Sequence, residues 1–338
     1  MSQIAKAAGV SRSAVSFVLN NVPDARIGAD TRQRILDAAR KLNYVPDSAA
    51  TRLAGGNIGT IALVLRRNQH QVITDRFLAQ ALFGISAAVK GQGFSILVEP
   101  LDPADLKATY GNLVRSRRAD GMIVWGPRIG DEELNRIHAE GFPIVLIGSL
   151  PASEIPSVGV DNVNAARTAV NHLLGLGHQR IACITEASLD YYSSRDRLAG
   201  YRLALKQSGL FVDEQLIRHA DFTDEGGARA MTELLDESPR PTAVFAGSDV
   251  VALGALGAIR ATRTFQVPDD IALVGFGDIP LAEYVVPSLT TIRVPAYELG
   301  FSAGEMLTRS ISVRRASVES ITLDVELIVR QSCGATIL

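Results

Sequence analysis

The sequence contains only two cysteines, and it has no apolar run long enough to cross a bilayer. Cys183 and Cys333 each lie in or beside an apolar run, with no second cysteine or histidine at metal-ligand spacing. This pattern predicts reduced, partly buried thiols rather than a disulfide or a zinc site. A membrane-spanning helix needs about 20 consecutive apolar residues, and the first residues lack the apolar segment of a secretory signal. We therefore expect a soluble cytoplasmic protein with no membrane partner.

Catalytic and cofactor motifs are also scarce. The five histidines show neither H-E-x-x-H spacing nor another paired metal-ligand spacing. The segment GGNIGT, residues 55–60, lacks the lysine of a phosphate-binding loop and follows no predicted strand. The sequence therefore predicts no metal, no cofactor and no enzymatic activity. A sugar-processing α/β enzyme would need a nucleophile, a base or a metal cluster that this sequence does not offer.

Charge is modest in amount but unevenly distributed. The 338 residues are 21% charged and 47% hydrophobic, with a formal net charge of −2. Residues 1–56 contain eight basic and four acidic side chains, a net charge of +4, which leaves −6 for the remainder. A basic N-terminal segment on an acidic body predicts attraction of that segment to nucleic-acid phosphates. The length suits two or three domains.

The first 45 residues predict three short helices. Gly9 lies at the bend between the first two, and Ser11 is a good N-cap for the second. Gly28 or Asp30 opens the third. Two short helices that cross at a glycine-containing turn are typical of a helix-turn-helix; the alternative is a generic three-helix bundle. The apolar positions expected to face a shared core are Ile4, Ala8, Val10, Val15, Val18, Leu19, Ile35, Ala39 and Leu42.

From Ile58 onward, short apolar runs alternate with amphipathic helical segments. Such alternation predicts an α/β fold in which helices cover both faces of parallel sheets. About ten strands are more than one open sheet of this type usually needs, so we expect two similar lobes. The final segment, ASVESITLDVELIVRQS, alternates apolar and polar residues and predicts a closing β segment.

Several motifs together resemble the lactose-repressor (LacI/GalR) family of bacterial transcription regulators. The N-terminal part carries AKAAGVSRSAVSFVLNN, TRQRILDAARKLNYVPD and AATRLAGG. The body carries VGVDN, HLLGLGHQRIA, RLAGYRLAL and VPDDIALVGFGDIPLAEYVVPSLTTI, so the resemblance covers essentially the whole chain. It implies a helix-turn-helix domain over residues 1–46, a hinge helix or linker over 47–57 and a two-lobed, periplasmic-binding-protein-like body over 58–338. The lobes would comprise about 58–160 with 291–318, and about 161–287 with 320–332.

The resemblance also implies a set of DNA-contacting residues. Arg12 and Ser13 fall where the recognition helix reads bases, and Phe17 stands where a polar reader is usual. Phe17 either contacts the groove, for example a thymine methyl group, or packs back onto the core of the small domain. In the hinge helix, residues 48–54, Ala50 is a further contact and Leu53 matches a leucine that wedges into a minor-groove step. The positions that typically contact the phosphate backbone are Ser11, Ser16, Asn20, Thr31 and Tyr44.

For a small-molecule effector, the resemblance implies a pocket in the crevice between the two lobes. Arg197 matches an arginine that clamps ligand hydroxyls or a carboxylate; otherwise it is an exposed cation at the start of a helix. Phe222 falls where an aromatic ring often stacks against a sugar; otherwise it is a core or lid residue.

Other pocket positions depart from the family pattern. Ser248 replaces a common asparagine, while Asp249 and Asp278 keep carboxylates of that pattern. Gly148 and Gly277 stand where sugar-binding members often carry aspartates. The identity of the effector therefore stays open at this point.

The segment LRRNQHQVITDRF, residues 65–77, is longer and more basic than is usual in the family. Its polar residues favour an anionic or phosphorylated ligand, or else they form a solvated surface loop. The residues concerned are Arg66, Arg67, Asn68, His70 and Arg76.

Taken together, the resemblance implies a homodimeric regulator, most simply a repressor. Its partners would be double-stranded operator DNA and a sugar, sugar phosphate or related metabolite as effector. Induction and co-repression both stay open. The main rival of another class, a solute-binding receptor of a transport system, predicts a signal peptide and no basic head.

Overall fold

A computed structural model of the chain describes residues 1–19, 27–42, 44, 58–102, 109–313 and 319–336. The chain divides into two compact units, Met1–Gly59 and Thr60–Leu338, which we call the head and the body. The hinge residues Ala50 and Leu53, together with Asn20, lie outside the described residues.

The head consists of three helices, α1 (Ser2–Ala8), α2 (Arg12–Leu19) and α3 (Ala29–Lys41), as the sequence predicts. Gly9 ends α1 with φ of 66°, a left-handed conformation that glycine adopts without steric cost. Ser11 Oγ accepts a hydrogen bond from the backbone N–H of Ala14 at 3.1 Å, and Gly28 is the N-cap of α3. The buried core is formed by Ile4, Ala5, Ala8, Val15, Val18, Ile35, Ala38 and Ala39.

Leu42 is the exception to the core expected for the head. It follows the last residue of α3 and is 44% exposed. Because the helix ends at Lys41, its regular spacing no longer directs the next side chain onto the core. Tyr44, two residues further on, packs partly buried against the core instead.

The first sheet of the body has the strand order β11-β5-β4-β3-β1-β2, and all of its pairings are parallel. Its strands are β1 (Thr60–Leu65), β2 (Ser95–Pro100), β3 (Gly121–Trp125), β4 (Ile144–Ile147), β5 (Ser157–Val160) and β11 (Ile321–Leu323). Helices α6 (Arg76–Lys90) and α14 (Ala296–Ser312) pack on one face, and α7 (Tyr110–Arg115) and α8 (Glu133–Ala139) pack on the other. A short helix, α5 (Gln69–Thr74), precedes α6.

The second sheet has the strand order β12-β10-β9-β8-β6-β7 and is parallel except for the β10–β12 pair. Its strands are β6 (Ile181–Thr185), β7 (Ile217–His219), β8 (Ala243–Ala246), β9 (Ala272–Gly277), β10 (Thr290–Arg293) and β12 (Glu326–Ile328). Helices α9 (Asn162–Gly175) and α10 (Tyr192–Gln207) cover one face, and α11 (Asp224–Leu235) and α12 (Asp249–Ala261) cover the other. The short α13 (Leu281–Tyr284) lies between β9 and β10.

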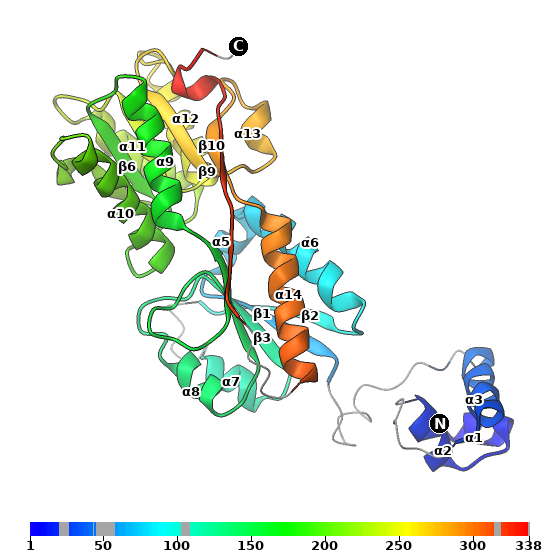
Figure 1. The fold of residues 1–338 in the computed structure, drawn as a ribbon. Coiled ribbons are helices and arrows are strands. Elements are labelled where there is room, and N and C mark those ends of the chain that lie inside the picture. The colour runs from blue at the N-terminus through cyan, green and yellow to red at the C-terminus, as the bar shows by residue number, and fades with distance from the viewer. Residues whose placement is uncertain (20–26, 43, 45–57, 103–108, 314–318, 337–338) are drawn as a thin grey trace. The chain divides into compact units, whose positions relative to one another are not determined.

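The chain passes between the two sheets after β5, after β10 and between β11 and β12. The last passage is the red C-terminal segment in Figure 1. The expected lobe limits assign residues 291–318 to the first lobe and 320–332 to the second, but β10 pairs with β9 in the second sheet and β11 pairs with β5 in the first. The closing β segment is therefore one alternating stretch whose two halves complete the edges of different sheets.

Helices α6 and α14 lie side by side and pack through glycines (Figure 1). A Cβ atom at Gly84 would overlap the backbone carbonyl oxygen of Tyr297, and one at Gly300 would overlap that of Ala81. Residues 300–304 also match G-x-S-x-G, the spacing of a hydrolase nucleophile elbow. That elbow is a sharp strand-to-helix turn, whereas these residues lie within the continuous helix α14. The glycine spacing here therefore serves helix packing.

Candidate functional site

The DNA-contacting residues expected in the head gather around α2. Val15 and Val18 are buried in the core, whereas Arg12, Ser13 and Phe17 are exposed. Phe17 is 45% exposed and lies outside the core cluster of the described head residues, which argues against packing onto that core. The second helix thus presents a cation, a hydroxyl and an aromatic ring to solvent.

The other expected phosphate contacts differ in how accessible they are. Ser11 is exposed, although its hydroxyl already caps α2. Ser16 is half-buried, and Thr31 is half-buried with its Oγ1 accepting a hydrogen bond from Arg34 Nη2 at 3.3 Å. Tyr44 lies against the core. The four side chains thus differ in exposure, from the exposed Ser11 to Tyr44, which packs against the core.

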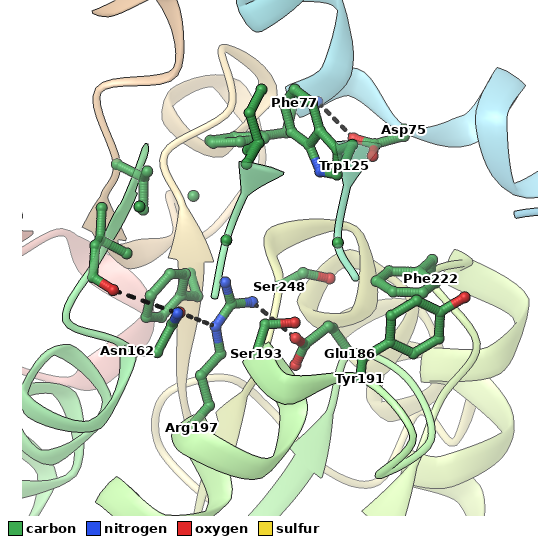
Figure 2. A pocket seen from close by; sticks show the side chains of 18 of the residues that line it. Asp75, Phe77, Trp125, Asn162, Glu186, Tyr191, Ser193, Arg197, Phe222 and Ser248 are labelled. Carbon is green, nitrogen blue, oxygen red and sulfur yellow. Dashed lines mark hydrogen bonds and ion pairs between the residues drawn. The ribbon is translucent and has the colours of Figure 1, made fainter. Parts of the chain in front are cut away.

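The body contains a cavity of about 140 Å³ between its two sheets (Figure 2). Trp125, Val160 and Gly277, the last residues of β3, β5 and β9, all line it. The carboxyl ends of parallel strands are where ligands bind in open α/β folds, so the expected crevice is present. Its polar lining includes Arg67, Asp75, Asn162, Glu186, Ser193, Arg197 and Ser248, and its aromatic lining includes Phe77, Trp125, Tyr191, Tyr192, Phe222 and Phe276.

Arg197 projects from α10 into the centre of this cavity (Figure 2). Its Nε donates a hydrogen bond to Asn162 Oδ1 at 2.9 Å, and its Nη1 donates one to the carbonyl oxygen of Gly247 at 2.5 Å. Nη1 also lies 3.3 Å from Glu186 Oε1, and the guanidinium stacks 3.8 Å from the ring centre of Phe276. Burial lowers the pKa of Arg197 from its ordinary value, and Glu186 opposes this effect. Arg197 is thus a half-buried pocket residue, with its side chain 16% exposed, rather than an exposed helix-start cation.

Glu186 is a pocket residue that our reading of the sequence missed. It follows directly after β6, and its side chain is 2% exposed. A charged residue at the carboxyl end of the apolar run IACIT is the signal that identifies it. It is the only carboxylate that an ion pair joins to Arg197 among the described residues.

Phe222 lines the pocket and is 9% exposed, with φ of 66°. Its ring meets Tyr191 edge-on at 4.8 Å between ring centres, and the guanidinium of Arg67 lies 3.9 Å from its ring centre. Arg67 in turn forms an ion pair with Asp75. Phe222 therefore forms an aromatic wall of the cavity that an arginine from the first half of the body holds in place.

The basic segment before α6 forms the helix α5 rather than a solvated loop. Asn68 caps this helix, and His70 lies near Glu225 at its exposed surface. Arg66 lies 3.8 Å from Asp131, away from the cavity lining. Of the basic residues in this segment, Arg67 alone lines the pocket as described, and its charge is matched by Asp75. Arg76 is exposed at the start of α6 and lies outside the cavity lining, so the segment adds no unmatched positive charge to the pocket.

The remaining expected effector residues separate into two groups. Ser248 lines the pocket and caps α12, since its Oγ accepts a hydrogen bond from the backbone N–H of Val251. Asp249 also lines it but is 1% exposed. Its Oδ1 accepts from Thr291 Oγ1 at 2.5 Å, and its Oδ2 accepts from the backbone N–H of Ile279 at 2.8 Å. Asp249 is therefore committed to joining α12 with β10.

Asp278 is not among the residues that line the described cavity. Its carboxylate accepts hydrogen bonds from Arg293 Nε and Arg330 Nη2, both at 2.7 Å. Because φ of Asp278 is 56°, the chain turns sharply after β9 and directs this side chain toward the two arginines. We therefore leave Asp278 out of the proposed effector site.

Contacts between the two halves of the body lie beside the pocket. Arg128 Nη2 donates a hydrogen bond to Asp190 Oδ2 at 2.9 Å, and Gln71 Nε2 donates one to the carbonyl oxygen of Asp221 at 2.9 Å. The hydroxyl of Tyr191 donates to the carbonyl oxygen of Arg66. These contacts join the carboxyl-end loops of both sheets and so hold the two halves of the body together beside the cavity.

Acidification is expected to stabilise the body through Asp249. Burial raises the pKa of Asp249 to about 6, above the value of about 3.9 for an unfolded aspartate. The folded state therefore binds this proton more tightly, and its stability rises as the pH falls from about 6 to 4, by roughly 1–3 kcal/mol. Urea unfolding at pH 7, 6 and 5 measures the effect as the difference between wild type and Asp249→Asn. A difference that stays constant with pH would contradict it.

The two cysteines, Cys183 and Cys333, are free thiols and are buried. No group of three or more histidine, cysteine, aspartate or glutamate side chains is placed to hold a metal ion within the described ranges. No helix in the described part of the chain is long and apolar enough to cross a membrane.

Comparisons with known proteins match this architecture. Residues 1–47 match the family of bacterial regulatory proteins of the lacI type, and residues 170–333 match the periplasmic binding protein-like domain. The HTH-type transcriptional repressor CytR of Escherichia coli (strain K12) is 35% identical over 340 residues, covering 99% of this chain and 96% of the relative. The HTH-type transcriptional regulator CelR of Thermobifida fusca is 31% identical over 335 residues, covering 98% and 97%.

Solved structures agree with these matches. A complex of the transcriptional regulator CelR with cellobiose has a TM-score of 0.75 at 30% identity, and the match covers 98% of both chains. The lac repressor dimer bound to operator and the anti-inducer ONPF has a TM-score of 0.83 at 26% identity, again with 98% of both chains covered.

The helix-turn-helix head and the two-sheet body with its central cavity define a DNA-binding transcription regulator. The chain belongs to the LacI family of bacterial regulators.

Proposed function

We propose that this chain represses transcription by binding operator DNA as a homodimer, and that a sugar or sugar derivative in the body cavity controls its operator affinity. The observation that carries this proposal is the cavity between the two sheets, where Arg197 lies among aromatic walls in a chain that also has a DNA-binding head. The solved complexes of CelR with cellobiose and of the lac repressor with operator support both parts.

For DNA binding, we propose that α2 enters the major groove with Arg12 and Ser13 on base edges and Phe17 on an apolar base group. Phosphates would be bound by Ser11, Ser16, Asn20, Thr31 and Tyr44, with Ala50 and Leu53 of the hinge at the minor groove. Domain limits of 1–46, 47–57 and 58–338 accompany this assignment. Because a bacterial chromosome lies in the cytoplasm, the regulator would act there.

A homodimer would place two heads on the two half-sites of a pseudo-palindromic operator. Large apolar side chains exposed on the body support such an association. Phe83 on α6 and Tyr284 on α13 are 70% and 74% exposed, and Tyr297 on α14 lies 5.9 Å from Phe83 between ring centres. Phe83 and Tyr297 form an exposed aromatic cluster, and exposed apolar patches mark protein interfaces.

Within the pocket, we propose that Arg197 and Ser248 bind the effector's polar groups and that Phe222 stacks against its ring. Asp249 would act indirectly, by holding the turn that carries Ser248. Any ligand that binds one arrangement of the body more tightly shifts operator affinity, and operator shifts ligand affinity by the same factor. The sign of that coupling decides between induction and co-repression.

Arg12→Ala is expected to weaken specific DNA binding by about 1–3 kcal/mol and to relax the choice of one base, because arginine in the first turn of a recognition helix reads guanine. The test is to select binding sites from a random duplex pool with the full chain and then to measure Kd for selected and scrambled DNA. Arg40→Ala, at an exposed position of α3, is the control and should change both Kd values alike. If Arg12→Ala retained full selectivity, the recognition-helix assignment would be wrong.

A further inference from the structure

The Glu186 carboxylate is the least satisfied polar group of the pocket. Its side chain is 2% exposed, and neither of its oxygens has a hydrogen-bond partner among the described residues. Buried polar groups in proteins are nearly always hydrogen-bonded, since an unmet acceptor carries the full desolvation cost. In Figure 2 this carboxylate lies beside Arg197 within the cavity lining. Its position therefore points to a ligand as the missing partner.

The surrounding residues hold Glu186 without meeting its hydrogen-bonding capacity. Arg197 Nη1 lies 3.3 Å from Oε1 and balances the charge, but its hydrogen bonds go to Asn162 and to the carbonyl oxygen of Gly247. Residue 247 must be small, because a Cβ atom there would lie 2.7 Å from both the backbone nitrogen and Oε2 of Glu186. Gly247 thus leaves room for the carboxylate, and neither carboxylate oxygen has a hydrogen-bond partner among the described residues.

The charges that line the cavity are already balanced or negative. Arg67 is paired with Asp75, and Arg197 is paired with Glu186. Asp249 adds a further buried carboxyl group. No lining arginine in the described structure is left without an acidic partner, so a phosphate or carboxylate on the ligand would meet net negative charge.

We propose that Glu186 determines which effectors this regulator accepts. Its two oxygens accept hydrogen bonds from a pair of donors on the ligand, either adjacent hydroxyl groups or an amino group. The same carboxylate disfavours phosphorylated and acidic ligands. This assignment rests on the proposed function, in which the cavity is the effector site. It narrows the effector class from sugars, sugar phosphates and related metabolites to neutral or amino-substituted ones.

The proposal is tested by comparing the binding of ligands that differ mainly in their charge. The probes are glucose, galactose and mannose with their 2-amino and 6-phosphate forms, and ribonucleosides with their 5′-monophosphates. Thermal shift followed by calorimetry on the full chain gives each affinity. We expect a neutral or amino form to bind and its phosphate to bind at least about tenfold more weakly, since an unpaired charge is rejected by a buried polar site. Hydroxyl and amine recognition are separated by comparing each sugar with its 2-amino form.

Glu186→Gln keeps the size of the side chain but removes its charge and one acceptor. The best probe should bind about tenfold more weakly to this variant, and the discrimination against its phosphate should shrink by a similar factor. Glu225→Gln makes the same chemical change at an exposed position of α11, 67% exposed and outside the cavity lining, and should leave affinity unchanged. Glu186→Asp keeps the charge and should still bind the neutral probe more tightly than its phosphate. This variant provides the test if Glu186→Gln does not fold.

Equal binding of a phosphate and its neutral form, equal affinities of wild type and Glu186→Gln, or binding by none of these probes overturns the proposal. Operator binding measured on the same preparations separates this failure from that of the proposed function. If the protein binds operator and a ligand weakens or strengthens that binding, the proposed function holds. If ligand affinity then shows no dependence on ligand charge, only the proposed role of Glu186 is wrong.

Discussion

Arg197→Ala is expected to destabilise the body by about 3–5 kcal/mol, because removal of one partner leaves the other buried charge uncompensated. The side chain of Glu186 is 2% exposed, so water replaces the lost guanidinium poorly. The substitution also removes two hydrogen bonds, to Asn162 and to Gly247, and the stacking on Phe276. If Arg197 binds the effector as proposed, the same variant loses the response to ligand.

Urea unfolding monitored by circular dichroism measures this loss. Arg202→Ala is a matched control on the same helix, because Arg202 pairs with Glu214 at 2.7 Å with side chains 43% and 66% exposed. An exposed pair contributes only about 0–1 kcal/mol, so this control should unfold nearly as wild type does. Adding Glu186→Gln to Arg197→Ala should restore part of the lost stability, since it removes the stranded charge. Equal losses in the Arg197 and Arg202 variants would show that burial of the pair does not matter.

Gly300→Ala is the second change with a large expected effect. Its Cβ atom would overlap the backbone carbonyl oxygen of Ala81, and a backbone atom in a packed helix pair cannot move aside as a flexible side chain does. Helices α6 and α14 must then separate, with an expected cost of about 3 kcal/mol, at the upper end for overpacked cores. Phe77 on α6 and Leu299 on α14 line the cavity, so effector binding should weaken with the packing.

Gly257→Ala provides the opposite control. This glycine lies within α12, and a Cβ atom there would meet none of the described atoms within 4 Å. Alanine loses less backbone entropy than glycine in a helix, so this variant should gain about 0.5–1 kcal/mol in free energy of unfolding. Thermal and urea unfolding of the two variants compare the signs directly. Destabilisation of similar size by both would exclude helix contact as the cause.

Local sequence patterns predicted the helices of the head and the parallel sheets of the body. The spacing of apolar residues, Gly9 at the bend, Ser11 as a cap and Gly28 before α3 predicted the head almost to its boundaries. The prediction that Leu42 faces the core was wrong, because the helical spacing of apolar residues does not show where the helix ends. The alternation of apolar runs with helical segments likewise predicted parallel sheets, since such strands are buried on both faces.

Those patterns did not predict which strands pair or which distant side chains form contacts. Strand β10 belongs to the second sheet and β11 to the first, and the apolar residues of neither strand indicate which sheet it joins. Asp278 and Asp249 are both carboxylates near the ends of apolar runs, yet one is held by two arginines and the other by Thr291 and Ile279. Their partners lie far away in the sequence, and only folding brings them together.

The sequence by itself determined the modular plan of this regulator: a basic three-helix head, a doubly wound acidic body, and Arg12 and Arg197 as the cations of its two candidate sites. The head and the body follow from local periodicity, capping and charge, which a chain displays along its length, whereas the assignment of Arg197 follows from the resemblance to the LacI family. The tertiary structure decided which charges remain available. In the folded body, Arg67 pairs with Asp75. Glu186 is buried beside Arg197, and neither of its carboxylate oxygens has a hydrogen-bond partner among the described residues. Whether a charged side chain has a partner depends on its neighbours in the folded protein, which the linear sequence does not specify.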